Sequence, residues 1–214
     1  HIKKTAIGRI PSLPQKVQNI RIVPNGVNLD KFKFKKRDRG WNIAYLGYVH
    51  YRKGPVLLLH AFRELVRFDK RYQLFIGGKI EDIHYVLYFN QMIKEMGLEE
   101  NVHFDGWIEN QSINTWLDDK QYIVCTSIHE GHPVGIMEAM ACGLKPLIHN
   151  YVGARESYPD TYIWNTIPEF VDMVTGGEYT PLKYRKFIEA NYNLDAQLEK
   201  VENIISEAGK RMVR

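Results

Sequence analysis

The stretch "WNIAYLGYVHYRKGPVLLLHAFRELVRF", residues 41–68, carries the clearest indication of the fold. It opens with a short apolar run that ends at Gly47, a pattern typical of a buried strand. A polar loop follows, and Pro55 then begins a segment whose apolar residues recur at helical spacing. A strand, a loop and a helix in this order predict one βα unit of a parallel sheet.

The same order of segments continues along the chain. Strands are expected at 72–78, 101–107, 122–127, 145–150 and 161–165, and helices at 81–97, near 110–118, from Val134 and over 194–208. Strands separated by such helices predict an α/β fold: a Rossmann-like parallel sheet with helices on both faces. In the helix at 81–97, the spacing predicts that Ile83 and Leu87 face the core and that Gly97 ends the helix.

The chain divides into three parts. Residues 1–39 are expected to form an interdomain connector, with a short strand in "IRIVPNGVNLDKF" (20–32) that leads into the sheet. Residues 40–190 are expected to form the Rossmann-like domain, and residues 191–214 a C-terminal amphipathic helix. The basic run "KFKFKKRDRG" (31–40) is expected to be a solvated part of the connector.

The composition limits the class of function. Of 214 residues, 44% are hydrophobic and 25% are charged, the balance of a globular domain with a core. Lys and Arg exceed Asp and Glu by 29 − 25 = 4, a mild excess that suits an anionic small ligand or an acidic membrane surface. The excess is too evenly spread to indicate nucleic acid.

Cysteine usage and hydropathy favour a cytoplasmic protein. Cys125 and Cys142 lie in apolar surroundings, where buried and reduced thiols are expected. No metal-ligand spacing is present, and no apolar run reaches the length of a membrane span.

Ligands of an open parallel sheet bind at the carboxyl ends of the strands. Gly47 and the pair Gly77–Gly78 end two expected strands and would let a ligand approach the backbone, although single glycines are more often tight turns. Arg52 and Lys53 stand just before a helix start, and two cations beside the positive end of a helix suit a diphosphate. No G-x-G-x-x-G fingerprint or G-x-x-x-x-G-K-[ST] loop is present, so a nucleotide would bind by another arrangement.

Two acids, Glu130 and Glu138, stand in "EGHPVGIMEAMACG", residues 130–143. Pro133 disfavours a continuous helix through both and favours a helix start directly after it, so Glu130 becomes a loop residue and Glu138 lies one turn inside the helix. The backbone N–H groups of 132–135 are then free, and both carboxylates can accept hydrogen bonds from vicinal sugar hydroxyls. The alternative is that Glu130 caps the helix and Glu138 is a solvated surface residue.

These motifs resemble one enzyme family. "EGHPVGIMEAMACGLKP" is similar to the signature of glycosyltransferase family 4, two glutamates separated by seven residues, and the family comprises retaining enzymes of the GT-B fold. "RIVPNGVNLDKF", "IAYLGYVHYRKGPVLLLHAFREL", "YQLFIGGKIED" and "GLEENVHFDGWIEN" resemble further landmarks of the family in the same order. The resemblance covers roughly residues 20 to 160, and the ordered set is more specific than any one motif.

The resemblance implies a hexosyltransferase and one half of its GT-B fold. The chain is similar to the C-terminal domain, which binds a nucleotide-diphosphate sugar of the UDP or GDP type and needs no metal or other cofactor. The N-terminal domain, which holds most of the acceptor site, has no counterpart here, so the chain alone is expected to be inactive. The implied partners are the donor and that missing domain. The basic pI also permits peripheral contact with the inner face of a membrane.

The resemblance also implies roles for single residues. Glu130 would bind the hydroxyls of the donor sugar and Lys53 the diphosphate, and these two are the implied catalytic residues. Glu138 would bind the ribose, while Trp107 and Ile108 would contact the base. The implied donor site comprises Gly47, Arg52, Lys53, Trp107, Ile108, Glu130, Gly131, His132, Pro133, Val134, Gly135 and Glu138.

Other functions stay open. Tyr48 stands where the family usually has an arginine, so the diphosphate loses one cation unless Arg52 replaces it. This departure gives weight to a non-catalytic nucleotide-binding module. A nucleotide-sugar epimerase of related fold is a second alternative. A hydrolase that uses Glu130 and Glu138 as acid and base is a third, and it would need both groups to flank a glycosidic bond.

Overall fold

Six parallel strands form one sheet in the order β3-β2-β1-β4-β5-β6. The computed structural model describes residues 21–80 and 82–212. The strands are β1 (Asn42–Leu46), β2 (Gln73–Gly77), β3 (Val102–Gly106), β4 (Tyr122–Cys125), β5 (Lys145–His149) and β6 (Ile163–Trp164). This is the order of a doubly wound Rossmann sheet, whose switch point lies between β1 and β4, so the predicted fold class is confirmed.

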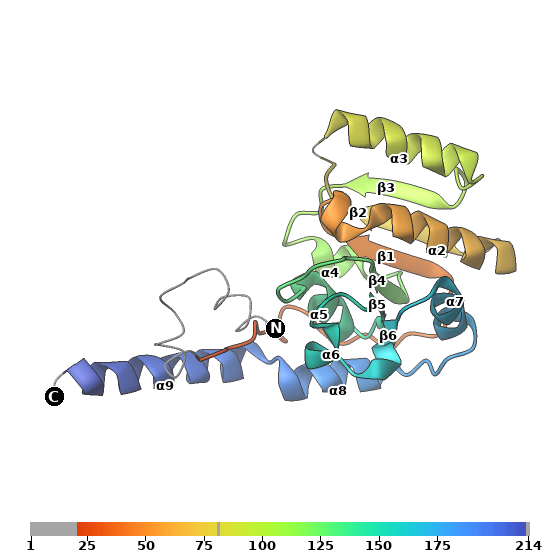
Figure 1. The fold of residues 1–214 in the computed structure, drawn as a ribbon. Coiled ribbons are helices and arrows are strands. Elements are labelled where there is room, and N and C mark those ends of the chain that lie inside the picture. The colour runs from red at the N-terminus through yellow and green to blue at the C-terminus, as the bar shows by residue number, and fades with distance from the viewer. Residues whose placement is uncertain (1–20, 81, 213–214) are drawn as a thin grey trace.

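Helices cover both faces of this sheet (Figure 1). They are η2 (Tyr51–Lys53), α2 (Pro55–Phe68), α3 (Ile83–Glu95), α4 (Ile113–Trp116), α5 (Val134–Ala141), α6 (Ala154–Ser157), η3 (Asp160–Tyr162), α7 (Ile167–Thr175), α8 (Pro181–Asn191) and α9 (Leu194–Met212). Ile43 and Tyr45 of β1 pack into the core that contains α2 and α7, whereas Ala44 packs into the core that contains α5 and α8. The two-residue period of a strand thus supplies an apolar surface to both helix layers.

The strands and helices expected after residue 40 are present, although the strands are shorter than their apolar runs. The pattern predicts no element over 166–191, where the structure has α7 and α8. Each of these helices buries only two side chains completely, Phe170 and Val174 in α7, and Tyr184 and Ile188 in α8. Among the described residues, no helix is long and apolar enough to cross a membrane.

The core-facing side predicted for α3 is wrong in part. Ile83 and Leu87 are 64% and 62% exposed, and Phe89 is the residue that this helix buries. Because α3 lies near the edge of the sheet, beyond β2 and β3, only a narrow side of it meets the core (Figure 1). Gly97, with φ 65°, directly follows the C-cap residue Met96, so the expected glycine end is confirmed.

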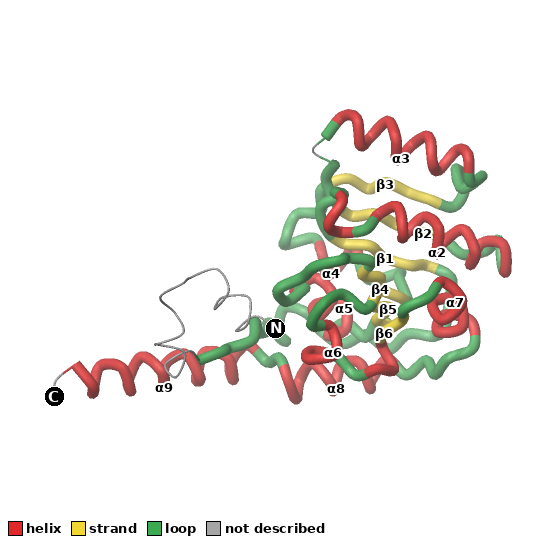
Figure 2. The backbone as a smooth tube through the Cα atoms, in the orientation of Figure 1, coloured by secondary structure: helices red, strands yellow, loops and turns green. Residues whose placement is uncertain are grey.

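The short strand expected in the connector is absent from residues 21–39, and residues 1–20 lie outside the described range. Val27 makes one isolated parallel bridge with Asn193, and the Gly26 N–H donates to Gln197 Oε1 at 2.6 Å. This segment therefore runs as a loop beside the start of α9 instead of joining the sheet (Figure 2). The proline and glycine of the stretch explain the difference, because both interrupt a ladder.

The basic run at 31–40 is not solvated throughout. Arg37 is buried, and burial lowers the pKa of its guanidinium. It donates hydrogen bonds of 2.7 to 3.1 Å to the carbonyl oxygens of Leu117, Asp118, Lys120 and Cys142. These carbonyls precede β4 and β5, so Arg37 anchors the connector across the amino edge of the sheet.

The two cysteines are structural. Cys125 and Cys142 are buried and free, as expected. Burial raises the pKa of Cys142 to about 11, and its thiol donates to Asn114 Oδ1 at 3.1 Å. A buried, protonated thiol of this kind is unreactive.

Candidate functional site

The loops after β1 and β4 meet at the carboxyl edge of the sheet, at its switch point. The Thr126 hydroxyl donates to the carbonyl oxygen of Lys53 at 2.8 Å, and the Ile128 N–H donates to that of Arg52 at 2.9 Å. Gly54 adopts φ 62°, and a Cβ there would lie 2.1 Å from the carbonyl oxygen of Thr126. Glycine is therefore required where the loops touch, and this contact fixes the backbone of Lys53.

An ion pair joins the two loops. Lys53 Nζ lies 2.5 Å from Glu130 Oε1, and Ser127 Oγ donates to the same oxygen at 2.5 Å. The side chains of Lys53 and Glu130 are 29% and 11% exposed, so solvent screens this pair less than a surface pair. The structure thus joins two residues for which the sequence predicted separate roles on the sugar and the diphosphate.

α5 begins directly after Pro133, as the sequence predicts. Pro133 occupies the N-cap position and no side chain caps the helix, so the alternative in which Glu130 is the cap is wrong. The first helical hydrogen bond returns to the Pro133 carbonyl at 3.1 Å, which leaves the N–H groups of Val134 and Gly135 for an outside acceptor. These residues line a pocket of about 80 Å³ together with Lys53 and Glu130.

A second pocket, of about 300 Å³, shares Leu46 with the first. It is lined by Leu46, Gly47, Gly77, Trp107, Ile108, Asn110, Ile113 and Glu138. Its walls are therefore mostly apolar, and Asn110 and Glu138 supply the carboxamide and carboxylate groups. Glu130 and Glu138 lie in separate, adjoining pockets at one edge of the sheet.

Glu138 is half-buried in the wall of the second pocket and is not a solvated surface residue. Burial raises the pKa of its carboxyl group to about 7, and the nearby charge of Lys31 opposes that rise. The Lys31 ammonium also donates a hydrogen bond to Asn110 Oδ1, at the same pocket. The charge of Glu138 is therefore sensitive to pH near neutrality.

Neither Tyr48 nor Arg52 lines the pocket that contains Lys53. Tyr48 packs against Trp107, with ring centroids 5.4 Å apart, and so extends the aromatic rim of the second pocket. Arg52 is exposed on η2 and lines neither pocket. The structure therefore does not bring the Arg52 side chain into the pocket of Lys53.

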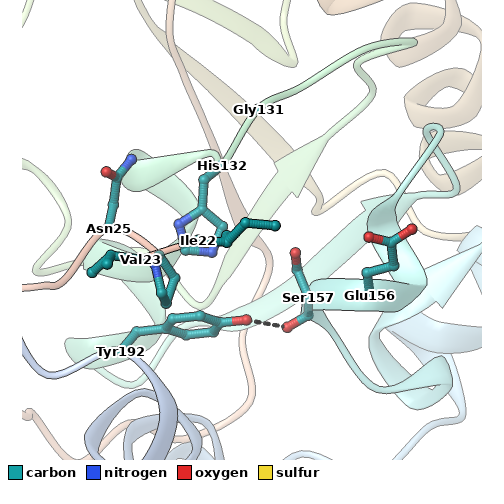
Figure 3. A pocket seen from close by; sticks show the side chains of 9 residues that line it. Ile22, Val23, Asn25, Gly131, His132, Glu156, Ser157 and Tyr192 are labelled. Atoms are coloured by element: carbon teal, nitrogen blue, oxygen red, sulfur yellow. Dashed lines mark hydrogen bonds between the residues drawn. The ribbon is translucent and has the colours of Figure 1, made fainter. Parts of the chain in front are cut away.

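Gly131 and His132 line a third pocket, of about 430 Å³. Figure 3 shows His132 beside Tyr192, and the two ring centroids are 4.7 Å apart. Both ring nitrogens of His132 are buried without a hydrogen-bond partner among the described residues, and burial lowers the pKa of the ring. The connector, at 22–25, forms another wall of this pocket. The His132 side chain thus belongs to this third pocket, unlike those of Pro133 and Val134, which line the first pocket.

The sequence interpretation omitted Ser127, Leu46 and Asn110, which all belong to the site. Leu46 ends β1 and Ser127 closely follows β4, so their position at the carboxyl ends of strands was an available signal. Asn110 also follows the carboxyl end of a strand, β3, but at a greater distance along the chain. In the part of the chain that the structure describes, no three His, Cys, Asp or Glu residues are grouped to hold a metal ion.

Comparison with known sequences gives matches to sugar-transferring enzymes. The sequence profile described as "Glycosyl transferases group 1" matches residues 27–212. The chain is 28% identical over 130 residues to GDP-mannose:cellobiosyl-diphosphopolyprenol alpha-mannosyltransferase of Xanthomonas campestris, which covers 60% of the chain and 34% of that protein. It is 29% identical over 101 residues to GDP-Man:Man(3)GlcNAc(2)-PP-Dol alpha-1,2-mannosyltransferase of Dictyostelium discoideum. This match covers 45% of the chain and 19% of that protein. The chain thus matches about a third or less of the length of these relatives.

Solved structures share the fold at low sequence identity. Sucrose-phosphate synthase from Thermosynechococcus elongatus has a TM-score of 0.77 at 17% identity, covering 98% of this chain and 57% of that one. Anabaena Alr3699/HepE in complex with UDP and glucose also has a TM-score of 0.77, at 16% identity, and the match covers 87% of this chain and 57% of that one. At these identities the likeness concerns the fold alone.

Proposed function

The chain belongs to the glycosyl transferases group 1 family, and from this premise we propose that it is the donor-binding C-terminal half of a retaining glycosyltransferase of family 4. The proposed reaction transfers a hexose from a UDP- or GDP-sugar to a glycan, a lipid or another acceptor. The observation that carries the proposal is the pair of adjoining pockets at the switch point of the sheet. The fold is that of one half of a GT-B glycosyltransferase.

The larger of the two adjoining pockets suits a nucleoside. Its apolar walls, which include Ile108, and the rim of Trp107 match the faces of a base. The ionised carboxylate of Glu138 accepts hydrogen bonds from the two ribose hydroxyls, because a carboxylate accepts and vicinal hydroxyls donate. At Gly47 a ligand can approach the backbone closely, because nothing lies within 4 Å of a Cβ built on this residue.

The smaller pocket suits the diphosphate and the start of the sugar. Lys53 and the N–H groups at the start of α5 supply positive charge and donors, and Glu130 accepts from a sugar hydroxyl. A volume of about 80 Å³ is that of only a few water molecules, so donor binding separates the Lys53 ammonium from Glu130. Gly131 and His132 then contribute through the backbone only, because the His132 side chain lies in the third pocket.

The proposed mechanism is front-face transfer with retention. The leaving diphosphate takes the proton of the acceptor hydroxyl, and Lys53 with the positive end of α5 stabilises the charge that develops on it. These groups supply the positive charge for which other enzymes use a metal, so the proposal includes no metal and no other cofactor. Arg52, exposed on η2, joins the diphosphate only if its side chain turns inward.

An N-terminal acceptor-binding domain completes the proposed enzyme, since the chain spans 34% of its Xanthomonas relative. That relative carries cellobiosyl-diphosphopolyprenol in its name, which supports a lipid-linked acceptor for this chain as well. A cytoplasmic location with peripheral contact to the inner face of a membrane fits such an acceptor. The mild net charge of +4 supports no nucleic-acid partner.

Calorimetric titration of the chain with UDP, GDP and their sugars, without magnesium, tests this function. One class of nucleotide is expected to bind, and Glu138→Ala is expected to weaken its binding about tenfold, because a hydrogen bond to a charged group is lost. Glu156→Gln is the matched control, because Glu156 lines the third pocket. We expect this variant to bind the nucleotide with unaltered affinity. A folded chain that binds no nucleotide would contradict the proposal.

A non-catalytic nucleotide-binding module is the second candidate. It is favoured by Tyr48, whose ring packs on Trp107 and lines no part of the Lys53 pocket. Sugar transfer by the complete protein distinguishes the two, because the module would bind nucleotide as tightly and transfer nothing. Robust transfer by the present chain alone would contradict the half-enzyme proposal.

A further inference from the structure

Two donors converge on one oxygen of Glu130. The Lys53 ammonium and the Ser127 hydroxyl each lie 2.5 Å from Oε1. No described residue donates a hydrogen bond to Oε2 of the same carboxylate. The carboxylate is therefore anchored through one oxygen, and the other is left for a ligand.

Ser127 is held more firmly than Lys53. It is 2% exposed, and its carbonyl oxygen is in hydrogen-bond contact with His149 Nδ1, 3.3 Å away on the neighbouring strand β5. The residue before it, Thr126, holds the carbonyl of Lys53 at 2.8 Å. The segment 126–127 therefore positions both partners of the ion pair, one through its backbone and the other through its side chain.

The two donors differ in what a ligand does to them. A diphosphate carries negative charge that competes with Glu130 for the Lys53 ammonium, and the ammonium has a long, flexible stem. A buried serine hydroxyl is uncharged, so a diphosphate does not draw it away. When donor occupies the site, Ser127 is the contact that continues to hold Oε1, through a charge-assisted hydrogen bond.

We propose that Ser127 is a positioning residue that holds Glu130 Oε1 and so directs Oε2 at a hydroxyl of the donor sugar. This inference rests on the proposed function, because it needs a nucleotide-sugar in the site. It deepens that function by separating the nucleotide part of the site from the sugar part. Ser127 then contributes to recognition of the sugar and not of the nucleoside diphosphate.

Calorimetry with matched ligands tests the inference. The probes are GDP with GDP-mannose and UDP with UDP-glucose, titrated into the wild-type chain, Ser127→Ala and the control Ser206→Ala, which changes an exposed serine on α9. Ser127→Ala is expected to weaken binding of the nucleotide-sugar about tenfold and that of the nucleoside diphosphate less than twofold. Retained binding of the diphosphate also shows that the variant is folded.

A double-mutant cycle with Glu130→Gln tests whether Ser127 acts through Glu130. In the Glu130→Gln background, Ser127→Ala is expected to change nucleotide-sugar affinity less than twofold, because the carboxylate it orients is gone. Equal losses for diphosphate and nucleotide-sugar, no loss for either, or full additivity in the cycle would each overturn the inference. Failure of the wild-type chain to bind any of the four ligands would instead refute the proposed function, on which the inference depends.

Discussion

Glu138 is an acidic residue of the candidate site whose pKa is raised by burial. Burial raises the pKa of its carboxyl from 4.5 to about 7, against the opposing charge of Lys31. Ribose hydroxyls donate hydrogen bonds to the ionised form, so nucleotide binding favours loss of this proton. The ionised Glu138 side chain therefore lowers the free energy of unfolding of the ligand-free chain at neutral pH.

This effect predicts how stability varies with pH. Between pH 4.5 and about 7 the folded chain keeps the Glu138 proton and the unfolded chain does not, so the wild-type free energy of unfolding falls as pH rises through that window. Glu138→Gln removes this term. Solvent contact of the half-buried side chain reduces the effect, so relative to the wild type the free energy of unfolding of the variant is expected to rise by about 1 kcal/mol between pH 4.5 and 8. Urea unfolding across this range measures the gain, and a pH-independent difference would contradict it.

Gly54 is the residue that allows the two site loops to touch. Gly54→Ala combines a left-handed backbone, φ 62°, with a Cβ placed 2.1 Å from the carbonyl oxygen of Thr126. Gly97→Ala is the matched control, because its φ of 65° is similar and nothing lies within 4 Å of its Cβ. We expect about 1 kcal/mol of destabilisation for Gly97→Ala and about 3 kcal/mol for Gly54→Ala, measured by urea unfolding. Equal costs would show that the loop contact is not tight.

The sequence predicts some of the site residues and not their pairing. Pro133 alone separates Glu130 from Glu138, and the structure places them in different pockets. The contact between Lys53 and Glu130 joins two loops far apart in the chain, and no local pattern determines how loop side chains point. The direction of His132 was unpredictable for the same reason, because its neighbour Tyr192 comes from the segment before α9.

Among the elements, α7 carries a sequence signal other than hydrophobic periodicity. The Thr166 hydroxyl accepts from the Glu169 N–H, and the Glu169 carboxylate accepts from the Thr166 N–H, which completes a capping box. The letters "TIPE" at 166–169 carry this signature in the sequence. Hydrophobic periodicity does not predict α7, because the helix is short and buries few side chains, whereas the capping-box residues predict where it begins.

The two threonine N-caps of α7 and α8 form a natural comparison. Thr166 accepts a hydrogen bond from the helix it caps, and Thr180 makes no such bond. Thr166→Ala is therefore expected to cost about 1 kcal/mol of stability, and Thr180→Ala only a few tenths. Thermal or urea unfolding of the two variants measures this difference. A cost for Thr180→Ala as large as that for Thr166→Ala would contradict the role of the capping box.

α3 shows the limit of periodicity at an edge. Its spacing marks Ile83 and Leu87 as core residues, yet both are exposed because α3 lies where the sheet ends. An amphipathic pattern indicates a helix without stating how wide a surface it covers. That width depends on the order of the strands, which local sequence does not contain.

At the scale of the whole molecule, alternation of strands and helices predicts a parallel sheet with two helix layers, and the structure confirms it. The strand order, with β1 next to β4, is what creates the switch point and brings the loop of Lys53 to that of Glu130. Such long-range pairing follows from packing of the complete chain. The family resemblance was therefore needed to connect residues that periodicity leaves apart.

A nucleoside diphosphate is proposed to bind where the loop of Lys53 meets the loop of Glu130. The first N–H groups of α5, at Val134 and Gly135, have no helical acceptor, so their exchange with deuterium should be fast in the empty chain. Hydrogen–deuterium exchange with and without the nucleotide that binds is the most direct test. We expect the nucleotide to slow exchange at 134–137, at 47–54 and around Trp107, and to leave exchange at 22–25, beside the third pocket, unchanged. Protection at 22–25 with unchanged exchange at 134–137 would contradict this expectation.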